Sequence, residues 1–163
     1  MPVLHVRIDN RLIHGQVAVA WSKHIGAKTL IVSSDEVARD EFQVAILKAV
    51  APPGLKVEIL DAAATVAYAK AHPGEGLFLL CKGPGDVLAL VDRGLDIREV
   101  NIGNMAFVVG AKAVTRSVYV TPEQAAIFAA LAGRGVRLVS QMMPADRPAD
   151  FMALLRDAGL VPG

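Results

Sequence analysis

Residues 6–21 of this chain read VRIDNRLIHGQVAVAW, a stretch in which a polar break separates an apolar strand from an apolar helix. The apolar residues within 3–8 predict the strand, residues 9–11 interrupt it, and residues 17–21 predict the helix. His14 is then expected where the helix begins, a place where free backbone N–H groups and the helix dipole favour anions. A neutral imidazole there, with the Arg11 guanidinium just upstream, makes His14 a candidate acceptor for a phosphoryl group.

The same alternation of short β-rich runs and alanine-rich helical stretches continues along the chain. Strands are predicted at 3–8, 28–32, 56–60, 76–82, 99–102, 114–120 and 136–142. Helices are predicted at 17–25, 35–50, 62–72, 86–91, 122–131 and 147–157, with Phe42, Ile46 and Val50 on one face of the second. Short connections between these elements favour an α/β fold, a mainly parallel sheet of about seven strands with helices on both faces. No repeat or linker divides residues 1–163, so we expect a single domain.

Composition excludes several classes of protein. The 163 residues are 53% hydrophobic and 20% charged, as expected of a folded domain and not of a disordered chain. Seventeen basic and sixteen acidic residues argue against a large face for nucleic acid. No apolar run is long enough for a membrane span, the start has no signal-peptide pattern, and the single cysteine, Cys81, cannot form an internal disulfide. We therefore expect a cytoplasmic protein.

Polar loops follow several predicted strands at the edge where sheets of this kind bind ligands. They are the His14 loop, Ser33–Asp35, Gly83–Gly85 and Asn101–Asn104. Because the carboxyl ends of parallel strands share one edge, these four loops are expected to surround a small anionic site. Gly83–Gly85 matches neither the dinucleotide fingerprint nor the phosphate loop of nucleotide-binding proteins, and it is interpreted more simply as a strand-to-helix turn.

Each residue near His14 has a functional and a structural interpretation. His14 itself could be an idle, partly exposed residue at a helix start. Arg11 presents a planar, permanent charge that suits phosphate oxygens, or it forms an ordinary salt bridge to Asp9. Asp9 fixes the tautomer of the imidazole, or it caps a turn, and Gln16 is a site residue or a solvated one. The other three histidines, His5, His24 and His72, are interpreted as structural or solvent-facing. The four histidines together do not have the spacing of metal ligands.

Four collinear segments resemble one known family. They are IDNRLIHGQV (8–17), SSDEVARDEFQ…LKAVAPPG (33–54), VNIGNM (100–105) and GVRLVSQMMP (135–144). They resemble the IIB component of the mannose/fructose/sorbose class of the bacterial sugar phosphotransferase system, over about residues 3–148. RLIHGQV is the most specific motif. Two positions depart from a common family pattern, with Asn10 in place of a second aspartate and Ser34 in place of an asparagine.

The resemblance implies that His14 is the phosphorylated residue and that the chain is a protein-Nπ-phosphohistidine–sugar phosphotransferase component. It also implies attack by Nδ1 of His14, with the other ring nitrogen held by a hydrogen bond. Arg11, beside Asp9, is expected to stabilise the phosphoryl oxygens together with backbone N–H groups of the loop, formed by Leu12, Ile13, Gly15 and Gln16. No metal, nucleotide or other cofactor is implied, because phosphohistidine is already an activated donor.

The implied partners are a IIA phosphohistidine donor, the membrane components IIC and IID, and a sugar, with the protein peripherally associated with the permease. Nucleic acid is not an expected partner, and a homo-oligomer is left open. One alternative is a phosphorylated regulatory protein of IIB type that signals to a partner without moving sugar. Another is an unrelated small-anion or nucleotide-binding domain. The sugar is not identified, because the family holds it chiefly on the membrane components.

Overall fold

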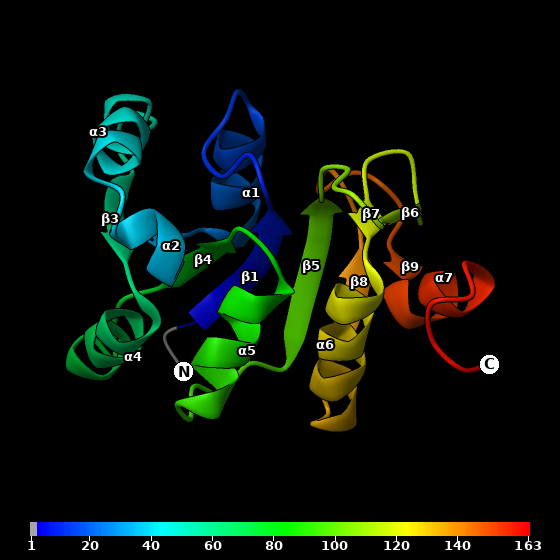
Figure 1. Cartoon of the computed structure of the whole chain (residues 1–163). Helices are drawn as coiled ribbons and strands as arrows, with labels where there is room; N and C mark the ends of the chain where they lie inside the picture. The colour runs from blue at the N-terminus through cyan, green and yellow to red at the C-terminus, as the bar shows by residue number, and fades with distance from the viewer. Residues whose placement is uncertain (1–2) are drawn as a thin grey trace.

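The computed structural model describes residues 3–163 and has a seven-stranded sheet at its centre (Figure 1). Its strands are β1 (Val3–Asp9), β2 (Thr29–Ser33), β3 (Lys56–Leu60), β4 (Leu77–Cys81), β5 (Glu99–Asn104), β8 (Arg137–Ser140) and β9 (Ala149–Asp150). They lie in the order β3-β2-β4-β1-β5-β8-β9, and all adjacent pairs are parallel except β8 and β9. The predicted mainly parallel α/β fold is confirmed.

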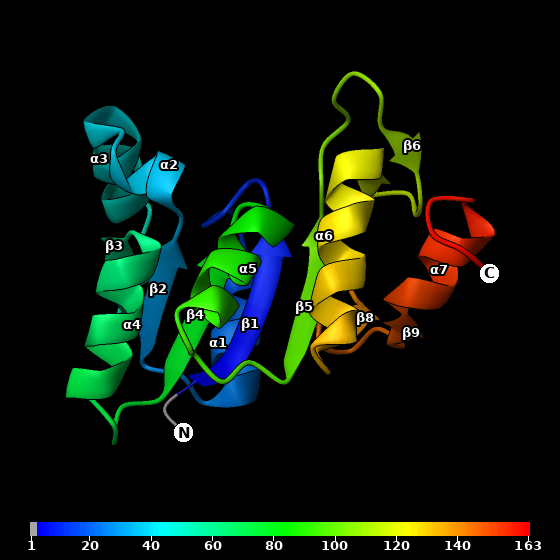
Figure 2. The ribbon, with the colours of Figure 1, turned by 60° about the horizontal axis from the view of Figure 1, so that its bottom comes forward.

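Helices cover both faces of the sheet. They are α1 (Val17–Ile25), α2 (Asp35–Ala38), α3 (Glu41–Ala49), α4 (Ala62–Ala71), α5 (Pro84–Asp92), α6 (Pro122–Gly133) and α7 (Phe151–Asp157). Figure 2 shows α4, α5 and α6 in front of the sheet and α1 behind it. Successive strand residues point to opposite faces, so Leu77 and Leu79 of β4 pack in the core under α4–α7, whereas Phe78 and Leu80 pack in the core under α1–α3. No helix within residues 3–163 is long and apolar enough to cross a membrane.

Three predicted elements differ from the structure. The predicted helix 147–157 begins only at Phe151, because Ala149–Asp150 pair with β8 as strand β9. Residues 114–120 are not a strand of the sheet, because the Val114 N–H donates to the Val118 carbonyl and turns the chain back on itself. A separate hairpin of β6 (Lys112–Ala113) and β7 (Tyr119–Val120) results, and β9 is the seventh strand instead. The predicted helix 35–50 is broken, because Asp40 accepts a hydrogen bond from the Gln43 N–H and begins a new helix, α3.

The position of β1 creates the ligand edge. The chain leaves β1 towards β2 on one side, and it leaves its neighbour β5 towards β8 on the other side. Connections that diverge from adjacent parallel strands open a crevice at the carboxyl ends of those strands. Asp9 ends β1 at this point, and it is aligned with Asn104 at the end of β5. The loop that carries His14 therefore begins at the switch point of the sheet.

Candidate functional site

The loop between β1 and α1 holds His14 ahead of the helix and not inside its first turn. Helix α1 begins at Val17, and Gln16 is its cap residue without a side-chain capping bond. Within residues 3–163, the backbone N–H groups of residues 13–16 donate to no other group of the protein. The Leu12 N–H, by contrast, donates to the Asp9 carbonyl at 2.9 Å. Leu12 was expected to offer its N–H to a phosphoryl group; the turn after β1 uses that donor instead.

Leu12 has an unusual backbone conformation for a residue with a side chain. Its φ is 60°, the left-handed region that normally favours glycine, at a cost of about 1–3 kcal/mol. The side chains of Leu12 and Ile13 are both buried in the core under α1–α3, which holds the strained turn in place. As a result the Leu12 carbonyl oxygen lies 3.0 Å from Nδ1 of His14. Two apolar residues of the motif therefore position its histidine.

The imidazole of His14 is held by the Leu12 carbonyl and not by Asp9. A carbonyl only accepts, so a neutral ring carries its proton on Nδ1 and its lone pair on Nε2. Nε2 is buried and has no hydrogen-bond partner within residues 3–163; it lies 3.9 Å from Oδ2 of Asp9, which is beyond hydrogen-bonding distance. In this conformation Asp9 therefore does not fix the tautomer, and its role during transfer stays a prediction. Nδ1, the nitrogen expected to attack, is the one held by a hydrogen bond in this conformation, and attack by Nδ1 stays a prediction.

Asp9 instead organises two arginines. Its carboxylate is fully buried and accepts from the Arg11 backbone N–H at 3.0 Å. The Arg11 guanidinium donates to both carboxylate oxygens through Nε and Nη2 at 3.3 Å each, while Arg7 donates through Nη2 at 3.4 Å. Arg11 keeps 42% of its side chain exposed. The salt-bridge interpretation of Arg11 is thus correct, and the exposed side of its guanidinium still faces solvent.

Arg7 is the site residue that the sequence interpretation missed. Its side chain is 1% exposed and donates to the Asn101 side-chain carbonyl and, at 3.0 Å, to the Gln141 backbone carbonyl. Burial lowers the pKa of the Arg7 guanidinium, and the Asp9 carboxylate opposes that shift. A Cβ on Gly103 would overlap the guanidinium, so β5 has room for Arg7 only because residue 103 is glycine. A charged residue inside a strand buried on both faces was the available signal.

Trp21 of α1 connects Arg7 to the loop after β8. The Arg7 guanidinium carbon lies 5.5 Å from the centre of the Trp21 ring, and the indole N–H donates to the Met142 carbonyl at 3.0 Å. Trp21 also stacks on His5, with ring centroids 4.5 Å apart. Burial, aided by the Arg7 charge, lowers the pKa of His5 to about 4. His5 is thus a partly buried, neutral histidine stacked on Trp21, in line with its structural interpretation.

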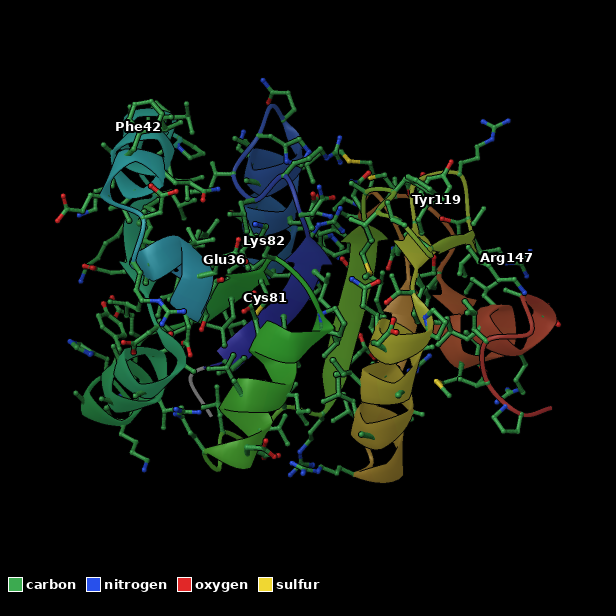
Figure 3. The ribbon with its side chains drawn as sticks, viewed as in Figure 1. Glu36, Phe42, Cys81, Lys82, Tyr119 and Arg147 are labelled. Atoms are coloured by element: carbon green, nitrogen blue, oxygen red, sulfur yellow. The ribbon has the colours of Figure 1, made fainter. Side chains whose placement is uncertain are left out.

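The four predicted loops divide into two groups. Asn101–Asn104 is not a loop but part of β5, and it meets the His14 loop through Arg7 and through a hydrogen bond from the Asn10 N–H to the Asn104 carbonyl. The other two loops meet each other, with Lys82 donating to Glu36 at 2.9 Å (Figure 3). Ser34 caps α2 there. A cavity of about 360 Å³ is bordered by Asn10, Lys82 and Pro84 and by neither His14 nor Arg11.

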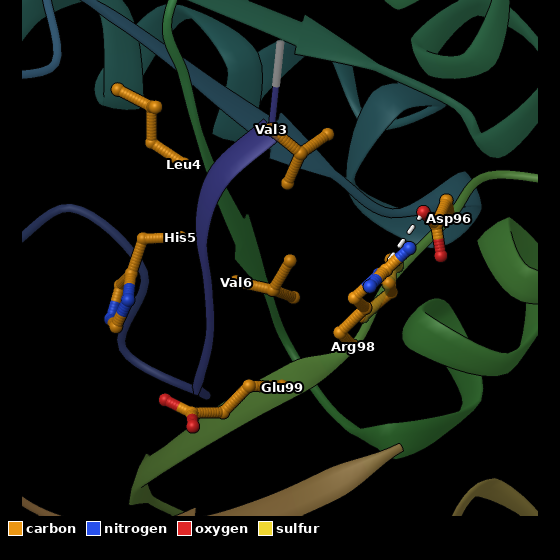
Figure 4. A pocket seen from close by; sticks show the side chains of 8 residues that line it. Val3, Leu4, His5, Val6, Asp96, Arg98 and Glu99 are labelled. Atoms are coloured by element: carbon orange, nitrogen blue, oxygen red, sulfur yellow. Dashed lines mark hydrogen bonds and ion pairs between the residues drawn. The ribbon is translucent and has the colours of Figure 1, made fainter. Parts of the chain in front are cut away.

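A second cavity lies at the opposite end of β1. It measures about 210 Å³ and is lined by residues 3–6 of β1 and residues 96–99 leading into β5 (Figure 4). The cavity forms because β1 pairs with β5 only from Arg7 to Asp9, so the two strands separate before Arg7. The ion pair in this cavity, between Arg98 and Asp96, is exposed. The cavity is remote from the carboxyl edge of the sheet, which holds His14. Among residues 3–163 no three histidine, cysteine, aspartate or glutamate side chains gather as metal ligands.

Comparison with known proteins places this geometry in a family. The family described as "PTS system sorbose subfamily IIB component" matches residues 3–161. The chain belongs to this family. A PTS fructose-specific EIIB component of Bacillus subtilis (strain 168) is 33% identical over 159 residues, which cover 96% of this chain and 98% of that protein. The mannose-specific EIIAB component of Escherichia coli (strain K12) is 38% identical over 151 residues, 91% of this chain but 47% of that longer protein.

The fold of this IIB component also matches that of solved relatives. The crystal structure of the IIBSor domain of the sorbose permease from Klebsiella pneumoniae superimposes with a TM-score of 0.92 at 34% identity, over 96% of this chain and 98% of that one. Family membership makes the chain a component of the sugar phosphotransferase system, which is a phosphoryl-transferring system. An unrelated nucleotide-binding domain is thereby excluded.

Proposed function

We propose that this IIB component relays a phosphoryl group through His14. The group comes from a phosphohistidine on a IIA partner and goes on to a sugar taken up through the membrane components IIC and IID. The observation that carries the proposal is the placement of the His14 imidazole beside the Asp9–Arg11 ion pair. The loop's N–H groups at residues 13–16 donate to no group among the residues that the structure describes. The mannose-specific relative, named as an EIIAB component, supports IIA as the donor.

The transfer forms an N–P bond at His14 as the N–P bond of the donor breaks. Attack by Nδ1, which the family resemblance implies, requires the ring to leave the Leu12 carbonyl and to carry its proton on Nε2. The Asp9 carboxylate, 3.9 Å from Nε2, then accepts a hydrogen bond from the Nε2–H group after a small closing movement. Asp9 would thus hold the ring during transfer, although it does not do so in the resting conformation.

Arg11 supplies the positive charge for the phosphoryl oxygens. Asp9 engages its Nε and Nη2 atoms, and within the described residues Nη1 donates to no protein group. The guanidinium is therefore fixed on one side and free on the other, as a preorganised donor should be. Such a donor contributes roughly 2–4 kcal/mol to the stabilisation of a transition state. The N–H groups of residues 13–16 add donors that need no side-chain movement.

A transfer experiment tests the proposal. The IIA portion of the E. coli mannose-specific relative, phosphorylated with labelled phosphate, is incubated with the purified chain, and acid-labile label on the chain is counted. We expect rapid labelling of the wild type and none of His14→Ala. The matched control is His72→Ala, because His72 is exposed at the end of α4. This variant should be labelled as rapidly as the wild type. Undiminished labelling of His14→Ala would refute the assignment.

A further inference from the structure

Met142, in the loop after β8, lies against both arginines of the site. Its sulfur is 3.7 Å from Nη2 of Arg7 and 3.9 Å from Nη2 of Arg11. Its backbone carbonyl accepts a hydrogen bond from the Trp21 indole N–H at 3.0 Å, which holds the residue in this position. The side chain is only partly buried and therefore open to small solutes.

A thioether suits this position because it contacts a guanidinium without neutralising it. Sulfur in methionine is polarisable and a weak hydrogen-bond acceptor. Arg11 therefore keeps most of its charge for an incoming phosphoryl group. A stronger acceptor at the same place would compete with the phosphoryl oxygens for Arg11, because charge-assisted hydrogen bonds are about twice as strong as neutral ones.

We propose that Met142 is a redox-sensitive modification site that controls phosphoryl acceptance by His14, an inference that rests on the function proposed above. A peroxide oxidises the thioether to the sulfoxide: the peroxide O–O bond breaks, one oxygen is transferred to sulfur, and water or an alcohol is released. Sulfur loses two electrons and the peroxide gains them. The added oxygen, a strong acceptor carrying partial negative charge, is within reach of the two Nη2 atoms that the sulfur already contacts.

The sulfoxide slows transfer for two reasons. It binds Arg11 and Arg7 by charge-assisted hydrogen bonds, and it brings negative charge next to the place where the phosphoryl oxygens must be stabilised. The adjacent Met143 provides an internal comparison. Its N–H donates to Asp146 at 2.9 Å, and its sulfur contacts neither arginine among the described residues. Oxidation at residue 143 should therefore leave the arginines unchanged.

Hydrogen peroxide is the probe for the experiment. Wild type, Met142→Leu and Met143→Leu are each treated, the oxidised residues are mapped by peptide mass spectrometry, and the rate of phosphoryl transfer from IIA is compared with that of the untreated sample of the same variant. We expect treatment to slow wild type and Met143→Leu about fivefold or more and to leave Met142→Leu at its own untreated rate. Methionine sulfoxide reductases should restore the lost rate.

Three results would overturn the inference: full transfer by protein with Met142 sulfoxide, an equal loss in treated Met142→Leu, or oxidation of Met143 while Met142 remains reduced. Failure of the proposed function itself looks different. In that case the untreated wild type takes up no label on His14, before any peroxide is added.

Discussion

At the scale of single residues, the contact between Asp9 and Arg11 confirms the salt-bridge interpretation of Arg11, while its role towards a phosphoryl group stays a prediction. The ion pair between them is structural, yet it fixes one side of the guanidinium and leaves the other towards solvent. The role of Leu12 could not be predicted, because its left-handed backbone depends on the burial of Leu12 and Ile13 in the folded core. Arg7 escaped prediction because its partners come from β5 and from the loop after β8, far along the chain.

Replacement of Arg11 by lysine separates its chemical role from its structural one. A lysine retains the charge but loses the planar fork that grips Asp9 and presents a third nitrogen outward. We expect Arg11→Lys to lower the rate of phosphoryl transfer about tenfold, equivalent to about 1.4 kcal/mol. The free energy of unfolding should change by less than about 1 kcal/mol, because Arg11 is half exposed and Arg7 still neutralises Asp9. Rapid-quench kinetics and urea unfolding measure the two effects, and an unchanged transfer rate would remove Arg11 from the chemistry.

At the scale of elements, β5 shows where a sequence pattern misleads. Asn101–Asn104 was expected as a loop because glycine and asparagine are common in turns. In the structure these residues are β-strand, and their polar character serves the buried guanidinium of Arg7. The amide of Asn101 accepts from Arg7, and Gly103 leaves space for it. The face of β5 that lies towards α1 is therefore polar. This could not be predicted without knowing that β1 and β5 are neighbours in the sheet.

Addition of one methyl group to β5 tests this packing. Gly103→Ala should lower the free energy of unfolding by about 1–3 kcal/mol, because the new Cβ overlaps the Arg7 guanidinium and forces it from its partners. Gly85→Ala is the matched control: its Cβ meets open space near the start of α5, so it should be neutral or slightly stabilising. Urea unfolding measures both. Equal midpoints for the two variants would show that Arg7 is not confined as described.

At the scale of the whole molecule, alternating strands and helices were enough to predict the parallel sheet and the edge that carries His14. They did not predict which helix faces are buried. Phe42, Ile46 and Val50 share a face of the helix region, yet in the structure they are exposed, and Leu47 is the buried residue of α3. Periodicity locates an apolar face, but whether another element covers that face depends on the order of strands in the sheet.

Burial of His5 beside Arg7 makes the stability of the fold depend on the protonation of His5. Its pKa is about 4 in the folded protein and near 6.5 in the unfolded chain. As the pH falls below about 6.5, the unfolded chain binds a proton that the folded protein does not, so folding loses stability until pH 4. At pH 4.5 the loss should be roughly 2 kcal/mol relative to pH 7. His5→Phe keeps a ring to stack on Trp21 and should lack this part of the pH dependence; equal pH dependence in both proteins, measured by urea unfolding, would contradict the assignment.

The identity of the phosphorylated residue is the central question, and a single mapping measurement addresses it most directly. The wild-type chain is phosphorylated by IIA, digested at alkaline pH where phosphohistidine survives, and analysed by tandem mass spectrometry. We predict that the phosphate is found only on the peptide that contains His14 and only on that residue. Phosphate on His5, His24, His72 or a residue of another type, with His14 unmodified, would contradict the proposed relay.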